Sequence, residues 1–223
     1  MLRALPSGKA VFKTFTSADD AKREADLMRV MSTVFPTVLD VRHLEGRSVV
    51  VTDRCKPLSG AQPSAQMAGE LIPIIGAVIN RLHTEFNVAH LSLNPEHIAQ
   101  TREGEFVLLD PGAAQFLGAP LQFNPKMLGG FTAADVLVGG AFVEARLDWF
   151  SLGAVALWVA TRTVPFSSHT DYRYIMLKTL VEKDAPFKLI AALFPPVQLD
   201  IRILQLLTLG VARRHWPRRP PHT

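Results

Sequence analysis

The sequence predicts an α+β fold in which a β-rich segment comes first and a mainly helical segment follows. Polar and apolar residues alternate along Lys9 to Phe15, which is the period of a half-buried strand. Ala65 to Phe86 instead carries its apolar residues at helical spacing. Between these two segments, Cys55 to Ser64 is rich in Pro, Gly and Ser, a composition typical of a linker.

The composition is that of a folded globular protein without a membrane segment. Hydrophobic residues make up 48% and charged residues 20% of the 223 residues, which excludes wholesale disorder. A chain of this length can form one large domain or two small lobes that share an interface. The longest apolar run, Leu152 to Ala160, is shorter than the ~20 residues that a membrane-spanning helix needs.

Two features of the sequence bear on its compartment. The first residues, Met1 to Pro6, lack the hydrophobic core of a secretory signal. Cys55 is the only cysteine, which excludes an internal disulfide and is typical of a reducing compartment. We therefore expect a nuclear or cytoplasmic protein.

The β-rich segment continues after its first strand with a helix and a hairpin. Ser17 is a predicted N-cap, and the helix that it opens should run to about Met31. Val38 to Leu44 and Ser48 to Thr52 predict a hairpin about Gly46. Because its second strand is wholly apolar at its centre, we expect that strand to lie inside the sheet.

The helical segment contains a turn rich in polar residues. Pro73 predicts either a kink in the helix of Ala65 to Phe86 or a later start for it. A polar turn, His90 to His97, follows the helix, and a short strand within Phe106 to Gly112 ends in Asp-Pro-Gly. Further helices are expected between Thr170 and Val211.

Several motifs follow one another in the order and at the spacing of a known family. His90-Leu-Ser-Leu-Asn-Pro-Glu-His97 and Asp110-Pro-Gly112 resemble the catalytic and metal-binding loops of the eukaryotic protein kinases, which read His-Arg-Asp-x-Lys-Pro-x-x-Asn and Asp-Phe-Gly. Ala133-Ala134-Asp135 stands where that family has Ala-Pro-Glu, and Asp148 to Gly153 matches its Asp-x-Trp/Tyr-Ser-x-Gly helix start.

The resemblance implies a bilobal, protein-kinase-like fold. Residues 1–56 would form a truncated, β-rich small lobe, residues 57–212 a mainly helical large lobe, and residues 213–223 a basic tail. Kinases open with two strands joined by a glycine-rich loop that covers the nucleotide phosphates. Only Gly8 and about a dozen residues precede Lys13 here, which is too little for that hairpin and the next strand.

The resemblance also implies roles for individual residues. Lys13 would be the small-lobe lysine that grips ATP phosphates, and Glu24 the helix glutamate that pairs with it. Asp110 would hold magnesium, His90 would be a buried packing residue, and Asp148 would brace the catalytic loop. The residues alone allow simpler interpretations: a surface lysine, a solvated glutamate, an aspartate in a Pro-Gly turn and a helix N-cap.

Three positions of the loop carry residues unsuited to phosphoryl transfer. Ser92 stands at the position of the family's aspartate, Asn94 at that of its lysine, and His97 at that of its metal-binding asparagine. A serine hydroxyl is a poor general base, asparagine carries no charge, and magnesium prefers oxygen ligands to histidine. The segment Ala113 to Gly130 contains no Ser, Thr or Tyr that phosphorylation could modify.

We therefore predict a catalytically inactive pseudokinase without a metal or cofactor, which binds other proteins as a scaffold or regulator. The Gly-Phe-x-x-x-acid-x-Leu run that begins at Gly130, and the Leu-Asp-Trp-Phe run that begins at Leu147, look most like those of the spindle-checkpoint BUB kinases. This narrower resemblance implies a place in a kinetochore assembly. The alternative is an unorthodox nucleotide-binding enzyme that uses Lys13 and Asp110.

Basic residues at the end of the sequence raise a further possibility. Arg213, Arg214, Arg218 and Arg219 account for much of the net charge of +4. They are interpreted as a solubilising tail that complements a helix dipole, or as a patch for nucleic acid or an acidic partner. We favour the tail and expect no nucleic-acid binding, because no aromatic residues are interleaved with the basic ones.

Overall fold

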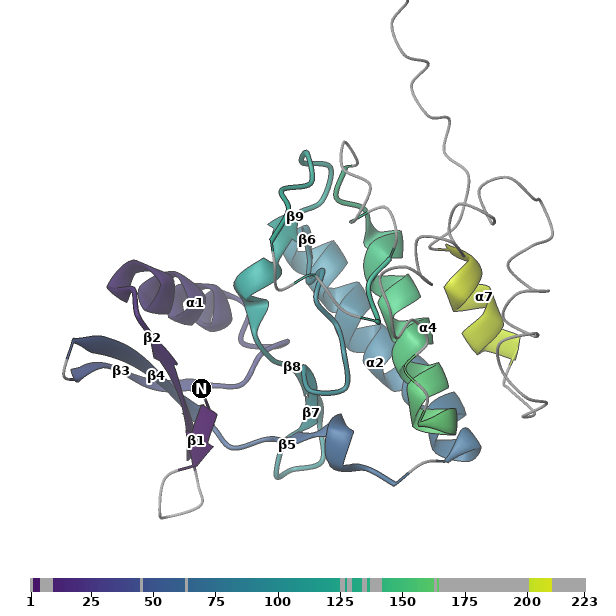
Figure 1. Ribbon diagram of the computed structural model, residues 1–223, viewed down its shortest axis with the longest axis horizontal. Coiled ribbons are helices and arrows are strands. Elements are labelled where there is room, and N and C mark those ends of the chain that lie inside the picture. Colours follow the sequence, from purple (N-terminus) through teal and green to yellow (C-terminus); the bar gives the residue numbers. More distant parts are fainter. Residues whose placement is uncertain are drawn as a thin grey trace, which may run out of the picture.

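The computed structural model describes residues 2–4, 10–44, 46–62, 64–124, 127, 130–133, 136, 142–162, 164 and 201–209. In this part of the chain the protein has an α+β fold. A four-stranded sheet and one helix lie on one side of Figure 1, and the longer helices lie on the other. The residues predicted as helices between 170 and 200, the tail 213–223 and Asp135 lie outside the described residues.

The first sheet is antiparallel throughout. Its strands are β1 (Leu2–Ala4), β2 (Ala10–Phe15), β3 (Val38–Leu44) and β4 (Arg47–Asp53), in the order β1-β2-β4-β3. The predicted hairpin is present, and its apolar strand β4 lies inside the sheet as expected, between β2 and β3. Val49, Val50 and Val51 of β4 are all buried. The sequence analysis missed β1, which is too short to show a period of its own.

Helix α1 (Ala18–Val30) lies against one face of this sheet. Ser17 caps it as predicted, since its Oγ accepts a hydrogen bond from the Asp20 N–H at 3.2 Å. The fully buried Ala21 and Ala25 pack against Val50 of β4. These small side chains let α1 approach the sheet closely. The approach sets the position of Glu24, which lies one helical turn after Ala21.

The expected linker has more structure than its composition predicts. It contains the strand β5 (Lys56–Pro57) and a 3₁₀ turn, η1 (Leu58–Gly60). Strand β5 pairs with β7 (Ile98–Gln100), which pairs with β8 (Phe106–Leu108) in a second antiparallel sheet. The boundary expected between residues 56 and 57 therefore falls within a paired strand.

The helical part is built on α2 (Ala65–Phe86), α4 (Ala145–Thr161) and α7 (Ile201–Leu209). Helix α2 has the predicted bounds and continues through Pro73, so the later start suggested by that residue was wrong. Gly153 of α4 allows α7 to approach, because a Cβ atom there would lie 2.8 Å from Leu206 Cβ. None of the described helices is both long and apolar enough to cross a membrane.

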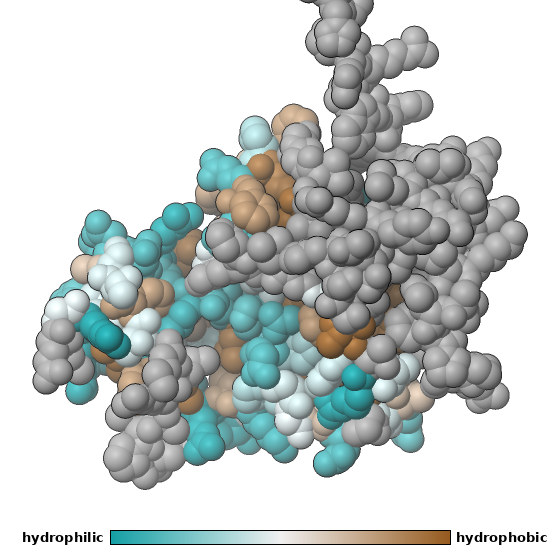
Figure 2. Space-filling view, viewed as in Figure 1, coloured by the Kyte–Doolittle hydropathy of each residue, from teal (hydrophilic) through white to brown (hydrophobic). Residues whose placement is uncertain are grey.

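Two short strands and a 3₁₀ turn complete the described structure. Strand β6 (Val88–Ala89) pairs with β9 (Gln115–Phe116), and η2 (Pro111–Ala113) precedes β9. Figure 2 shows apolar side chains gathered at the surface around β9. Phe116, Phe123 and Phe142 are 64%, 59% and 56% exposed, and Phe142 lies on a strand bridge to Pro120.

Candidate functional site

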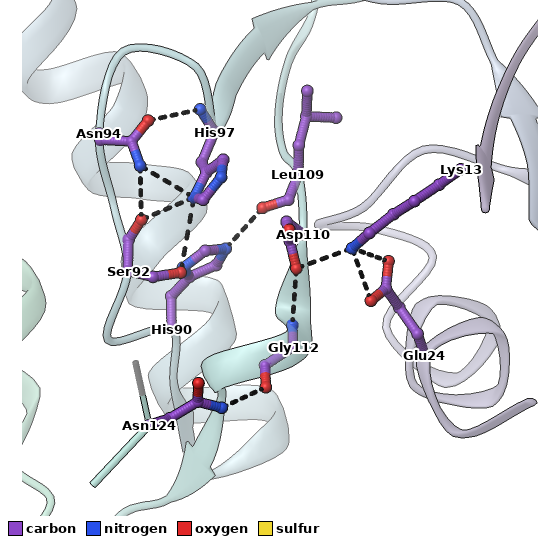
Figure 3. A network of polar contacts seen from close by, with 10 residues as sticks. All are labelled: Lys13, Glu24, His90, Ser92, Asn94, His97, Leu109, Asp110, Gly112 and Asn124. Carbon is purple, nitrogen blue, oxygen red and sulfur yellow. Dashed lines mark hydrogen bonds and ion pairs between the residues drawn. The ribbon is translucent and has the colours of Figure 1, made fainter. Parts of the chain in front are cut away.

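The sequence-predicted site residues come together where the first sheet meets the helical part. Figure 3 shows Lys13 and Glu24 on one side of Asp110, and the loop from His90 to His97 on the other. The Leu108 N–H also donates to the Val34 carbonyl at 2.9 Å, which ties the strand before Asp110 to the segment after α1.

Lys13 lies between two carboxylates. Its Nζ atom is 2.7 and 2.8 Å from the two carboxylate oxygens of Glu24, and 2.9 Å from Oδ1 of Asp110. The side chain of Glu24 is only 7% exposed, whereas those of Lys13 and Asp110 are 20% and 22% exposed. The interpretation of Glu24 as a solvated residue was therefore wrong: a buried carboxylate is stable here because an ammonium group neutralises it.

Asp110 combines the ion pair with a turn. Its backbone is left-handed, with φ 54°, and its Oδ1 accepts a hydrogen bond from the Gly112 N–H at 3.2 Å. The Gly112 carbonyl in turn accepts from Asn124 Nδ2 at 3.1 Å. The turn interpretation and the ion pair with Lys13 thus hold together.

His90 is fully buried in a single tautomer. Its Nε2 lies 2.8 Å from the Leu109 carbonyl oxygen, which can only accept, so Nε2 carries the proton. Its Nδ1 therefore accepts from the Ser92 hydroxyl at 3.3 Å. Burial disfavours the charged ring and lowers the pKa of His90 to about 4. A neutral, hydrogen-bonded His90 is the packing residue that the sequence analysis expected.

The polar side chains of the loop bond mainly to the loop itself. Asn94 Oδ1 accepts from the N–H groups of Glu96 and His97 at 2.8 and 3.2 Å, and Asn94 Nδ2 donates to the Ser92 carbonyl at 3.2 Å. That carbonyl also accepts from His97 Nδ1 at 2.7 Å. These four bonds all lie within the loop, and Ser92 is buried in it.

Asp148 of α4 anchors the start of the same loop, at His90 and Leu91. Its fully buried carboxylate accepts from the backbone N–H groups of His90 and Leu91 at 2.7 and 2.8 Å, and from His83 Nε2 at 2.9 Å. The N-cap of α4 is Glu144, so the N-cap interpretation of Asp148 was wrong. The left-handed backbone of Leu91, with φ 63°, turns its N–H toward the carboxylate.

Sequence analysis missed His83. It lies in the last turn of α2 and is buried against Asp148. The only signal in the sequence is its place four residues after Ile79, on the apolar face of the helix. That place predicts burial but does not identify a partner 65 residues away.

A cavity of about 410 Å³ lies in front of the loop. It is lined by η1, by the loop, by residues 130–132 and by the end of α4. The lining residues are Ser59, Ser92, Leu93, Asn94, Pro95, Glu96, His97, Gly130, Phe131, Thr132, Trp158 and Val164. Lys13 and Asp110 are not among them, so the cavity and the ion-pair cluster are separate features.

Within the described ranges, no three His, Cys, Asp or Glu side chains are grouped as they would be to hold a metal ion. Cys55 is half-buried, and burial raises the pKa of its thiol to about 11, which leaves it a poor nucleophile. No protein-family model matches the sequence.

Proposed function

We propose that this chain is a protein-kinase-like fold that has lost phosphoryl transfer and acts as a protein-interaction scaffold or regulator. One observation carries the proposal. At the loop positions where the resemblance places transfer chemistry, the polar side chains are engaged in hydrogen bonds with the loop itself and with His90.

The contacts around the loop support a kinase-like scaffold. The resemblance implies a lysine on a strand paired with a glutamate on the following helix, and Lys13 and Glu24 make such a pair between β2 and α1. It also implies an aspartate that braces the loop backbone, and Asp148 accepts two backbone hydrogen bonds from that loop. Both contacts are structural and need no nucleotide.

The residues of the loop support the loss of transfer. Phosphoryl transfer needs an acceptor for the substrate proton, a cation beside the phosphate and oxygen ligands for magnesium. The Ser92 hydroxyl donates its hydrogen bond to His90, and Asn94 brings no positive charge. His97 offers only nitrogen, and one of its two nitrogens is already bonded to the Ser92 carbonyl.

The surface supports proteins as the partners. Three exposed phenylalanines, Phe116, Phe123 and Phe142, lie on the segments around β9. Exposed apolar surface of this kind is typical of protein contacts. The narrower resemblance places such contacts in a kinetochore assembly, in the nucleus or the cytoplasm, and we include that setting in the proposal.

A second candidate function rests on the ion-pair cluster. Lys13, Glu24 and Asp110 converge from three segments, and this arrangement would suit a nucleotide with its metal ion. An unorthodox nucleotide-binding enzyme would then use Lys13 for phosphate and Asp110 for magnesium, even with the loop residues changed.

Thermal unfolding with ATP and magnesium separates the two candidates. A ligand that binds the folded state raises the melting temperature with its concentration, by RT ln(1 + [L]/Kd) in free energy. We expect the same melting temperature with ATP and magnesium as with magnesium alone. A rise that grows with ATP in the wild type, and is lost in Lys13→Met, would instead favour the enzyme.

A further inference from the structure

Three large apolar side chains are exposed on one part of the molecule, the segments around β9. They are Phe116, Phe123 and Phe142, and we call them together the β9 surface. Phe116 belongs to β9, and a strand bridge joins Phe142 to Pro120, which follows β9 closely. Figure 2 shows apolar side chains gathered at the surface there. Exposed apolar surface of this kind marks a site of contact with another molecule.

The backbone that carries these rings is held in place by hydrogen bonds. The Gln115 side chain bonds the backbone of Gln122 twice: its Nε2 donates to the carbonyl at 2.6 Å, and its Oε1 accepts from the N–H at 2.9 Å. The Gly118 N–H donates to the Val143 carbonyl at 2.8 Å, and the Val143 N–H donates to the Ala119 carbonyl at 2.9 Å. Because an ordered surface loses less conformational entropy on binding, this backbone is well suited to present the rings to a partner.

The segment that carries two of the three rings has no charged residue. No Asp, Glu, Lys, Arg or His occurs from Ala113 to Asn124. The first charged residue after Phe142 is Glu144, and its carboxylate lies 2.8 Å from Nε of Arg146. When two copies of one surface meet about a twofold axis, the charges on that surface face charges of the same kind. A neutral surface avoids this repulsion and offers a charged partner nothing to recognise, which favours a second copy.

The exposed area of the rings fits a weak dimer. Their exposed fractions are 64%, 59% and 56%. Because an aromatic side chain buries roughly 150–250 Å², three such rings from each of two copies would remove roughly 500–900 Å² from water. A stable dimer buries about 1,200–2,000 Å² in total. The rings would therefore supply about half of a stable interface, which suits a dimer that forms at micromolar concentrations.

We propose that the β9 surface binds the same surface of a second copy of this chain and forms a symmetric dimer. The rings of both copies leave water, and the segment from Ala113 to Asn124 brings no charge into the interface. The proposal rests on the scaffold function proposed above and deepens it by naming the partner of this surface. We expect the dimer to form without a nucleotide.

The test is sedimentation velocity of the full chain between about 2 and 200 µM, without nucleotide. We expect the wild type to pass from monomer to dimer with a Kd on the order of 10–100 µM. Phe116→Lys and Phe116→Glu should each weaken association at least about tenfold, because each places like charges on the two facing copies. Leu39→Lys and Leu39→Glu are the matched controls, since Leu39 is 51% exposed on β3 of the first sheet, and should leave the Kd unchanged.

Mixing the two charged variants tests whether the surface meets its own copy. An equimolar mixture of Phe116→Lys and Phe116→Glu brings opposite charges to the interface, so mixed dimers should form more tightly than dimers of either variant alone. Phe123→Lys and Phe123→Glu repeat the comparison at a residue outside the strands, so that a folding defect at position 116 does not decide the result.

Three results would overturn the proposal. They are a wild type that stays monomeric at about 200 µM, charged variants at 116 and 123 that associate as the wild type does, and mixtures that restore no association. A monomeric wild type would assign the β9 surface to a different protein and leave the scaffold function standing. Failure of that function is a separate result, because it is measured as transfer of label from ATP.

Discussion

Asp148 concentrates three hydrogen bonds on one buried carboxylate. It fixes two backbone N–H groups of the loop and the ring of His83 at once. An asparagine at this position cannot accept at both of its termini, so one donor would be left buried without a partner. The residue thus determines the shape of a loop whose bonded N–H groups are 57 and 58 residues away in the sequence.

We predict that Asp148→Asn lowers the free energy of unfolding by about 2–4 kcal/mol, the usual cost of breaking a buried charged network. Urea unfolding followed by circular dichroism measures it. Asp26→Asn is the matched control: Asp26 pairs with Arg29 on the surface of α1, and its loss should cost no more than about 0.5 kcal/mol. Equal losses in the two variants would contradict this role for Asp148.

His90 makes stability depend on pH in a defined window. Its pKa is about 4 when folded and near 6.5 when unfolded, so the unfolded chain binds one more proton between these values. The contribution of His90 to the free energy of unfolding is fully present above pH ~6.5. It falls by about 3 kcal/mol as the pH drops toward 4.

The variant His90→Gln should therefore lose stability less steeply than the wild type between pH 6.5 and 4. Urea unfolding at several pH values gives, for each of the two proteins, the slope of the free energy of unfolding against pH. The difference between the two slopes removes the contribution of the carboxylates, which both proteins share. Equal slopes of the free energy of unfolding against pH in the wild type and in His90→Gln would contradict this role for His90.

Helix α2 accommodates a proline through a contact with another element. Pro73 lacks the N–H that would bond the Gly69 carbonyl four residues before it. That carbonyl instead accepts from Arg202 of α7 at 3.0 Å. The proline thus frees an acceptor that ties α7 to α2.

Pro73→Ala should restore the helix bond and raise the free energy of unfolding by about 1–3 kcal/mol. Because Arg202 and the backbone N–H gained at position 73 would then share one acceptor, Arg202→Ala should cost less in the Pro73→Ala background than in the wild type. A double-mutant cycle by urea unfolding measures this coupling. A coupling energy of zero would contradict the contact.

At the scale of the whole molecule, elements with a strong local signal were predicted and those that depend on distant partners were not. The bounds of α2 and the cap of α1 follow from periodicity and from Ser17, both local features. Strands β1 and β5 have three and two residues, too few to show a period of their own. Strand β1 pairs with the next strand, β2, and β5 pairs with the distant strand β7.

The same distinction holds for the candidate site. The motifs predicted Lys13 on a strand, Glu24 on a helix and Asp110 at the end of a strand. The contacts of 2.7–2.9 Å between these side chains depend on how the first sheet packs against the helical part. The described residues that line the cavity come from four segments that are far apart in the sequence, and none of these segments indicates a cavity by itself. His83 likewise has a partner that only the tertiary fold supplies.

We propose that a kinase-like scaffold persists in this chain while phosphoryl transfer is lost. The most direct test is incubation of the full chain with radiolabelled ATP, magnesium and general protein substrates, beside Asp110→Ala and the surface control Asp26→Ala. We predict no incorporation of label above background in any of the three. Label that the wild type and Asp26→Ala transfer, and that Asp110→Ala does not, would contradict the claim.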